Sequence, residues 1–376
     1  MRIGLVIPGG VDPSGEERVI PALLWLIERL ARRHEVHVFS LFQLTRAQTF
    51  SFRGAHVHDL GFAGHRRSLP GFFLWSSGRA LRKEIAQAGP FDVLHAFWAD
   101  TTGALASEIG RGLGVPVLVS LGGGELVSLP SIGYGGASTL PRRLLVQRTL
   151  ARADRLSAAS EEMRQSVQAL GLPCELVPLG ADAALFHADV ARPEGPPWRL
   201  VHVADLNPVK DQPTLLRALR WVVDREASVH LDVLGQDTLG GAIQSLAAEL
   251  RLQGHVTFHG RRTVGQLVPF YRGAHLLVHS SLHEAGPLVV LEAALAGLPA
   301  VGTAVGTLAD LAPERAVAVP PGDAEALGAA ILSLLRDAPR RRALARRAQQ
   351  WALAHDADFT ARRFEEIYRE LVEGRG

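Results

Sequence analysis

The sequence has little cysteine, little lysine and no long apolar run, and each shortage excludes a class of protein. Cys174 is the one cysteine among 376 residues, which excludes an internal disulfide and argues against a cysteine-based metal site. We therefore expect a reducing, cytoplasmic setting. No uninterrupted apolar stretch reaches the roughly 18 residues that a membrane-spanning helix needs. The strand-like residues 2–7 break at Pro8 with no cleavage-site pattern behind them, so we expect no signal peptide.

Positive charge comes almost wholly from arginine, because Lys83 and Lys210 are the two lysines of the chain. The net charge is only +2, so no nucleic-acid partner is implied. Basic residues beside aromatic ones favour anionic lipid surfaces, and the stretch 65–83 therefore predicts peripheral contact with the inner face of a membrane. A solvated basic helix face is the alternative interpretation. Further basic clusters lie at Arg142, Arg143, Arg148 and Arg152, and at 340–342 with 346–347.

Length and composition predict a globular protein of two domains. A chain of 376 residues is too long for one compact core. Its 38 glycines and 22 prolines punctuate short apolar runs, as in proteins built from many strand and helix units. We place a first domain at 1–186, a proline-rich linker at 187–197, a second domain at 198–355, and at 356–376 an amphipathic helix that packs back toward the first domain.

Strand and helix patterns alternate through both domains. The opening reads as a strand at 2–7, a helix at 16–33 and a strand at 35–40, and the alternation restarts at residue 198. This order predicts an α/β fold of two doubly wound, Rossmann-like domains with parallel sheets. Ligand-binding residues should follow the carboxyl ends of the strands. In the first domain these places hold His95 with Trp98, the loop Gly122–Glu125, and Ser160 with Glu161.

The loop after the first strand contains Gly9 and Gly10. It lacks the ordered Gly-x-Gly-x-x-Gly spacing, so the fingerprint of a nicotinamide cofactor is absent. The two glycines would still let an anionic ligand approach the backbone and the start of the next helix. A plain tight turn is the alternative.

Two carboxylates in an apolar segment of the second domain are the strongest chemical signal. Glu284 falls in a predicted strand-to-helix loop, and Glu292 lies eight positions later inside the helix, among Leu, Val and Ala. A buried carboxylate needs a partner. Eight helical residues span roughly 12 Å, about the separation between the sugar and the ribose of a nucleotide sugar, and the backbone N–H groups of Gly286 and Leu288 would face the diphosphate between them. The alternative is one salt-bridged glutamate and one ordinary loop glutamate.

An ordered series of motifs resembles glycosyltransferase family 4, the retaining and metal-independent group with the GT-B fold. The series runs nearly end to end. It comprises Gly9-Gly10, the segments 32–38, 91–95, 153–160 and 177–186, Asn207-Pro208-Val209-Lys210-Asp211, Glu284 to Glu292, and 297–306.

The resemblance implies a transfer of sugar from a UDP- or GDP-sugar to an unknown acceptor in polysaccharide, glycolipid or other glycoconjugate synthesis. It places Lys210, with Asp205 and Asn207 in the same loop, at the donor diphosphate. Glu284 would hold sugar hydroxyls and Glu292 ribose hydroxyls. A leaving phosphate is stabilised by a cation and N–H donors, and carboxylates bind hydroxyls well. No cofactor, metal or protein nucleophile is implied, because the leaving phosphate helps to deprotonate the acceptor in such enzymes.

This chain departs from the family pattern at three places. Asp205 stands where the family has an arginine beside the donor phosphate, a role that Arg261 or Arg262 could take over. Gly122 replaces a histidine near the reacting carbon. Pro287, in Glu284-Ala-Gly-Pro, removes one N–H donor. These departures motivate an alternative, a catalytically impaired nucleotide-sugar-binding protein of the same fold. An epimerase of similar architecture is a lesser rival.

Overall fold

The computed structural model describes residues 1–63, 70–188 and 194–374 of the chain. They form two compact units, unit 1 (Met1–Leu179 with Ala357–Gly376) and unit 2 (Gly180–Asp356). The boundary precedes the predicted end of the first domain at 186. The reason is helix α6 (Ala183–Phe186), which packs on helices of unit 2, where Phe186 lies against Tyr271. Part of the predicted linker, 189–193, lies outside the described residues. In the described part of the chain, no helix combines the length and the apolar character needed to cross a membrane.

Unit 1 is built on an eight-stranded sheet of order β3-β4-β2-β1-β5-β6-β7-β8. All neighbours are parallel except β3, which runs antiparallel to β4 at the edge. Strand β3 was not predicted, because only Phe50 and Phe52 are apolar in it and four of its five side chains are exposed or half-exposed. The strands are β1 (Arg2–Ile7), β2 (Glu35–Ser40), β3 (Gln48–Phe52), β4 (Ala55–Asp59), β5 (Val93–Phe97), β6 (Val117–Leu121), β7 (Arg155–Ala158) and β8 (Glu175–Leu176).

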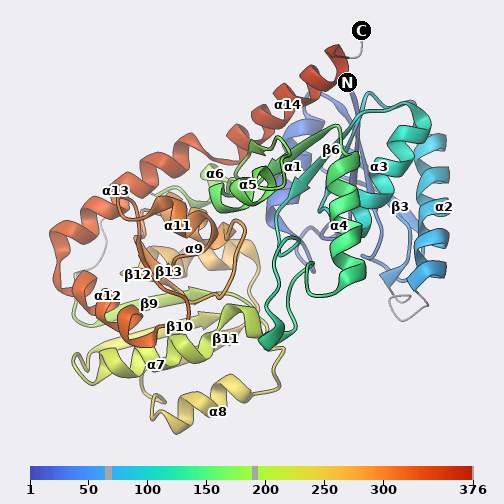
Figure 1. Ribbon diagram of the computed structural model, residues 1–376. Coiled ribbons are helices and arrows are strands. Elements are labelled where there is room, and N and C mark those ends of the chain that lie inside the picture. Colours follow the sequence, from blue (N-terminus) through green and yellow to red (C-terminus); the bar gives the residue numbers. More distant parts are fainter. Residues whose placement is uncertain (64–69, 189–193, 375–376) are drawn as a thin grey trace. The chain divides into compact units, whose positions relative to one another are not determined.

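Helices cover this sheet in two groups. Helix α3 lies between α2 and α4, whereas α1 packs against α14 (Figure 1). The predicted start of the first helix, residue 16, is wrong: the helix begins at Pro21, whose fixed φ suits a first turn, after Arg18 at a positive φ of 48°. The helices are α1 (Pro21–Ala31), α2 (Pro70–Ala88), α3 (Thr101–Leu113), α4 (Leu140–Arg152), α5 (Glu161–Gln168) and α14 (Ala357–Glu373).

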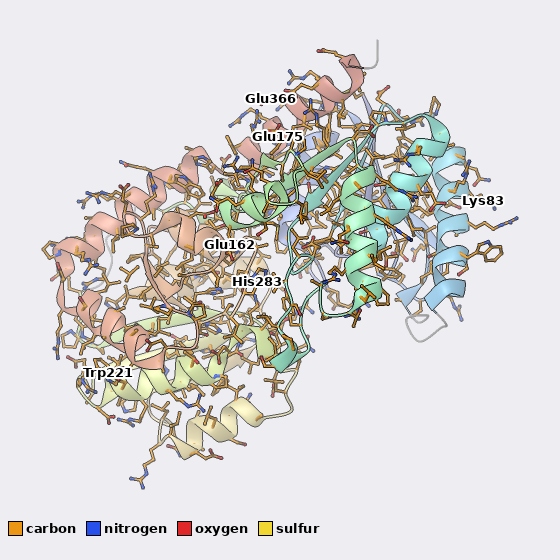
Figure 2. The ribbon with its side chains drawn as sticks, in the orientation of Figure 1. Lys83, Glu162, Glu175, Trp221, His283 and Glu366 are labelled. Atoms are coloured by element: carbon orange, nitrogen blue, oxygen red, sulfur yellow. The ribbon has the colours of Figure 1, made fainter. Side chains whose placement is uncertain are left out.

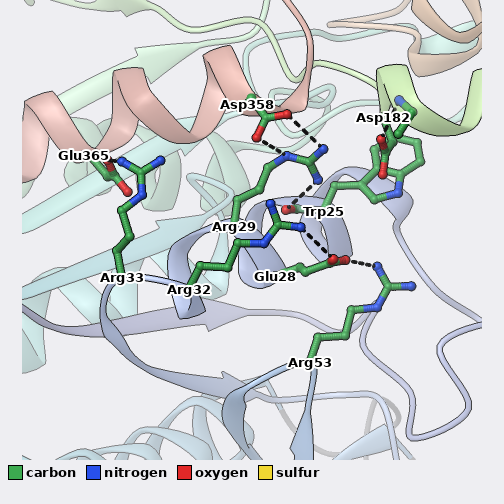
Figure 3. Close-up of polar contacts among 10 residues, drawn as sticks. Trp25, Glu28, Arg29, Arg32, Arg33, Arg53, Asp182, Asp358 and Glu365 are labelled. Carbon is green, nitrogen blue, oxygen red and sulfur yellow. Dashed lines mark hydrogen bonds and ion pairs between the residues drawn. The ribbon is translucent and has the colours of Figure 1, made fainter. Parts of the chain in front are cut away.

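The C-terminal helix α14 belongs to unit 1, as its amphipathic pattern predicts. Its buried Phe364 and Tyr368 join the core that contains the apolar face of α1. Arg29 of α1 is paired with Asp358 at 3.0 Å and Arg33 with Glu365 at 3.0 Å (Figure 3). Tyr368 also lies 2.6 Å from Nδ1 of the fully buried His95. The last helix is therefore an integral part of the first unit.

Unit 2 is built on a parallel six-stranded sheet of order β11-β10-β9-β12-β13-β14. The strands are β9 (Trp198–Val203), β10 (Val229–Leu234), β11 (Val256–Gly260), β12 (Leu276–His279), β13 (Ala300–Thr303) and β14 (Val317–Val319). The helices, besides α6, are α7 (Gln212–Val223), α8 (Ala242–Glu249), α9 (Val264–Gly273), α10 (Leu288–Leu295), α11 (Gly306–Leu311), α12 (Ala324–Arg336) and α13 (Ala338–Ala354). The α/β class and the two Rossmann-like sheets are as predicted.

Strand order marks one place in each sheet where α/β proteins commonly bind ligands. In unit 2 the chain runs from β9 outward to β10 and β11, and then returns to the other side of β9 with β12. In unit 1 the same reversal occurs between β1 and β5. The loops at the carboxyl ends of two such strands diverge and leave a crevice. The loops that follow β9 and β12, and those that follow β1 and β5, are therefore the candidate ligand-binding loops.

Candidate functional site in unit 2

Lys210 and Glu284 meet at the reversal point of the unit 2 sheet. Lys210 ends a 3-10 turn (Pro208–Lys210) after β9, and the side chain of Asn207 caps that turn by accepting the Lys210 N–H at 3.3 Å. Glu284 follows β12. The Lys210 ammonium group donates a hydrogen bond to Glu284 Oε1. The structure thus joins the two residues that were predicted to be catalytic, although 74 positions separate them in the chain.

Three groups surround the carboxylate of Glu284. Besides Lys210, Ser281 Oγ donates to its Oε1 at 2.7 Å, and His279 Nε2 lies 3.2 Å from the same oxygen. Burial raises the pKa of Glu284, but the Lys210 ammonium and the His279 ring outweigh it and hold the pKa well below its ordinary value. Glu284 is therefore a stable anion that can accept hydrogen bonds at neutral pH. Sequence reasoning missed His279 and Ser281, whose signal was a polar end on an otherwise apolar strand.

Hydrogen bonds to backbone carbonyl groups hold the two loops together. Ser280 Oγ donates to the Lys210 carbonyl at 2.8 Å, and the Leu282 N–H donates to the Val209 carbonyl at 2.8 Å. Thr303, at the end of β13, donates to the Ser281 carbonyl at 2.6 Å. These bonds fix the position of Lys210 relative to Glu284.

Gly306 packs closely against the backbone of the Glu284 loop. It opens α11 with a positive φ of 52°, which favours glycine. A Cβ at this position would lie 2.7 Å from the Ala285 carbonyl oxygen and 2.8 Å from that of Glu284. The family motif around residues 297–306 thus has a packing role next to the site.

Glu292 has a protein partner that the sequence did not reveal. It lies on α10, is only 2% exposed, and accepts a hydrogen bond from the Tyr271 hydroxyl at 2.7 Å through Oε2. Burial raises the pKa of Glu292 to about 7, and the Tyr271 hydrogen bond offsets this in part. The partner comes from α9 and could not be inferred from spacing along the chain. Helix α10 begins at Leu288, just after Gly286 and Pro287, so the Leu288 N–H lies in a first turn that has no acceptor within the helix.

Asp205 has a structural role in the loop after β9. It is exposed, and its Oδ1 accepts the Gln236 N–H at 2.7 Å, which ties this loop to the one after β10. Gln212 donates to the Asp205 carbonyl at 3.2 Å and lies 3.3 Å from the buried His202, whose pKa burial lowers to about 3. The carboxylate that replaces the family's arginine thus orders the loop that carries Lys210. Arg261 and Arg262 are exposed beyond β11, and Arg262 donates to the Arg261 carbonyl.

Unit 1 has its own cavity at the reversal point of its sheet. Gly10 has a φ of 93° and donates its N–H to Gln43 Oε1 at 2.7 Å, and a Cβ on Gly9 would lie 3.0 Å from the same oxygen. Pro8 and Trp98, which follow β1 and β5, line a cavity of about 660 Å³. The cavity is completed by Asp100, Thr101, Gly124, Glu125, Tyr134 and Arg142, with neighbouring residues of the same loops.

Glu125 is a buried titratable group in the loop that contains Gly122. It is 6% exposed, and the N–H groups of Gly122 and Gly123 donate to its two oxygens at 3.2 and 2.8 Å. Burial raises its pKa to about 7. A Cβ at Gly122 would lie 3.1 Å from Trp98 Nε1, so the indole occupies the space of a larger side chain there.

Other sequence-predicted positions have structural partners instead. His95 is fully buried between Tyr368 and Ser120, and Glu161 pairs with Arg164 at 2.6 Å on α5. Among the described residues, no group of three or more His, Cys, Asp or Glu side chains is placed to hold a metal ion.

Comparisons with known proteins agree with the fold. Residues 19–180 match the family described as "Glycosyl transferase 4-like domain", and residues 186–351 match "Glycosyl transferases group 1". The chain is 29% identical to a D-inositol 3-phosphate glycosyltransferase of Nocardia farcinica, over 78% of this chain and 69% of that protein. It is 26% identical to a phosphatidyl-myo-inositol mannosyltransferase of Mycolicibacterium smegmatis, over 100% of this chain and 95% of that protein.

Solved structures show the same fold at low identity. A sucrose-phosphate synthase from Thermosynechococcus elongatus superimposes with a TM-score of 0.83 at 21% identity, over the whole of both chains. Anabaena HepE in complex with UDP-glucose gives a TM-score of 0.73 at 17% identity, over 98% of this chain and 100% of that one. Two Rossmann-like units with these matches define a sugar-transferring enzyme of the GT-B class. Within that class, the chain belongs to glycosyltransferase family 4.

Proposed function

We propose that this enzyme transfers a sugar from a UDP- or GDP-sugar to an acceptor, with retention of anomeric configuration and without a metal ion. The observation that supports the proposal most is the Lys210–Glu284 ion pair at the reversal point of the unit 2 sheet. It sets a cation and a carboxylate side by side where α/β proteins bind nucleotides.

The donor would open this ion pair. Its diphosphate would pair with the Lys210 ammonium group. The sugar hydroxyls would then donate hydrogen bonds to the Glu284 oxygen that Lys210 no longer occupies. The N–H groups of Gly286 and Leu288 then face the phosphates. Ribose hydroxyls bind Oε1 of Glu292, because Tyr271 occupies Oε2. The approach of an anionic ligand to the backbone at Gly9 and Gly10 of unit 1 stays a prediction.

Charge develops on the leaving diphosphate as the bond between the anomeric carbon and the diphosphate oxygen breaks and the acceptor oxygen bonds to that carbon. Lys210 and the α10 amides stabilise that charge where it forms, and this is why no metal ion is needed in the proposal. The leaving phosphate accepts the proton of the acceptor hydroxyl on the same face of the sugar, which gives retention. Asp205 keeps its negative charge, but it is exposed to solvent, which screens its repulsion of the diphosphate, and the Gln236 N–H holds its carboxylate in the loop.

The acceptor would bind in unit 1. The two relatives are named for inositol 3-phosphate and phosphatidyl-myo-inositol. The cavity beside Trp98 holds polar groups suited to a polyol, which are Asp100, Glu125, Tyr134 and Arg142. We propose a phosphorylated polyol or its lipid as the acceptor class.

We also propose that the protein binds peripherally to an anionic membrane. The basic residues 65–67, which suggested this contact, lie outside the described residues.

A single assay tests the chemistry. The enzyme is incubated with UDP- and GDP-sugars and a panel of polyol acceptors, with and without a chelator, and proton NMR follows the anomeric signal of the product. We expect an α-linked donor to give an α-linked product at the same rate with chelator. A β-linked product would refute retention, and inhibition by the chelator would refute metal independence. Donor binding without nucleotide release would favour the non-catalytic alternative.

A further inference from the structure

Four arginines line a cleft on the helical face of unit 1. Helices α2, α3 and α4 enclose a cavity of about 480 Å³ whose wall contains Arg79 and Arg82 from α2 and Arg148 and Arg152 from α4. Within the described part of the chain, none of these guanidinium groups forms an ion pair. Glu108 of α3 is the acidic residue in the lining. Such a wall carries a strong positive field and offers many N–H donors to an anion.

Helices α2 and α4 each carry exposed apolar side chains and arginines beside this cleft. On α4, Leu140, Leu144, Arg148 and Arg152 recur every four residues and are all exposed, so apolar side chains occupy one end of the stripe and arginines the other. On α2, the exposed Trp75 precedes Arg79 and Arg82 at helical spacing. Lys83 points outward from the same helix (Figure 2). Trp75 is 62% exposed, Leu140 59% and Leu144 42%.

Arginines beside exposed apolar side chains favour a ligand that has both a phosphate and an apolar part. Guanidinium groups bind phosphate in a bidentate manner. Exposed tryptophan and leucine beside them gain free energy by entering the apolar edge of a bilayer, while the arginines keep their charged ends at the headgroups. A soluble phosphate would satisfy the arginines but would leave the exposed apolar side chains in water.

We infer that this cleft binds the phosphate headgroup of an anionic phospholipid and docks unit 1 on the membrane surface. The inference rests on the proposed membrane contact but not on the sugar transfer. Leu145 of α4 lines both this cleft and the cavity beside Trp98. A docked headgroup therefore lies across one helix from the proposed acceptor cavity.

The test uses the full chain and sedimentation with phosphatidylcholine vesicles, with and without phosphatidylglycerol. We expect binding that requires phosphatidylglycerol and weakens with salt. The variant Arg79→Ala/Arg148→Ala should weaken binding by about 25-fold, or about fivefold for each arginine near the surface. Glu108→Gln removes the acidic group of the cleft and should tighten binding, a gain that a folding defect cannot produce.

Matched controls separate the possible failures. Arg346→Ala/Arg347→Ala removes the same charge from exposed positions on α13 and should leave binding unchanged. If it weakens binding as much as the cleft variant, the response is to net charge and the cleft assignment is wrong. If wild-type protein ignores the vesicles, the membrane contact itself fails, whereas sugar transfer is unaffected. Binding of glycerol 3-phosphate that depends on Arg79 and Arg148, without vesicle binding, would overturn the lipid assignment.

Discussion

The ammonium group of Lys210 and the carboxylate of Glu284 contact each other between the loops that follow β9 and β12. Hydrogen bonds between the two loops fix the position of each residue relative to the other. The pair therefore responds as one unit: a change in either residue, or in the packing below Glu284, should alter donor binding.

Replacing Lys210 by alanine should reduce the rate of transfer by about 10²- to 10³-fold, the usual cost of removing one group aimed at developing charge. The measurement is kcat and KM for the preferred donor. Lys83→Ala is the matched control, because Lys83 is the other lysine of the chain and is exposed on α2. Equal rates in the Lys210 variant and the wild type would remove Lys210 from the mechanism.

Gly306→Ala should weaken donor binding while the fold persists. The added Cβ meets the carbonyl oxygens of Glu284 and Ala285 and displaces that loop. Gly240→Ala is the control for backbone strain, since Gly240 has a φ of 62° with no atom within 4 Å of its Cβ position. Donor affinity is measured by calorimetry. If both variants lose affinity equally, the effect is not transmitted through the Glu284 loop.

Stability should depend on pH through Glu292. Its carboxyl pKa is about 7 in the folded protein against 4.5 ordinarily, so the folded state keeps a proton that the unfolded chain releases. The stabilisation is complete below about pH 4.5 and is lost as the pH rises to about 7, on the order of 3 kcal/mol in all. In Glu292→Gln the thermal midpoint should fall less over this pH range. Part of the fall should remain, because the pKa of Glu125 is also raised to about 7 and that residue makes stability depend on pH in the same way. An unchanged pH profile would show that Glu292 is not held protonated.

Tyr271→Phe should destabilise unit 2 by about 1–3 kcal/mol, because it leaves the buried Glu292 without its hydroxyl donor. Urea unfolding measures the loss. In a Glu292→Leu background the same change should cost much less, since replacing both partners by apolar groups is nearly neutral. Equal losses in the two backgrounds would mean that the hydroxyl acts on another group.

The sequence was informative where a pattern is local. Strand and helix alternation predicted both sheets, and the Glu284–Glu292 segment was correctly divided into a loop and a helix. Tyr271, the partner of Glu292, was missed because it comes from another helix, α9, and spacing along the chain cannot reveal a contact that tertiary packing creates. His279 was missed although it ends β12, the strand directly before the Glu284 loop, where a polar residue closes an apolar strand.

The departures from the family pattern also gained physical explanations only from the structure. Asp205 suggested repulsion of the donor, but its carboxylate binds a backbone N–H of the neighbouring loop. Gly122 suggested a missing catalytic group, and the structure shows the Trp98 indole in that space and Glu125 bound to the same loop. Both explanations depend on contacts between separate strand ends.

The most direct test of the account is the stabilisation of the wild type and of Glu284→Gln by UDP, GDP and the corresponding nucleotide sugars. A ligand at about 100 times its Kd should raise the free energy of unfolding by about 2.7 kcal/mol. The account predicts that one nucleotide sugar stabilises the wild type more than its free nucleotide does, and that Glu284→Gln loses this extra stabilisation but keeps that of the nucleotide. A wild type that no nucleotide sugar stabilises, or a variant with an undiminished response to the sugar, would contradict it.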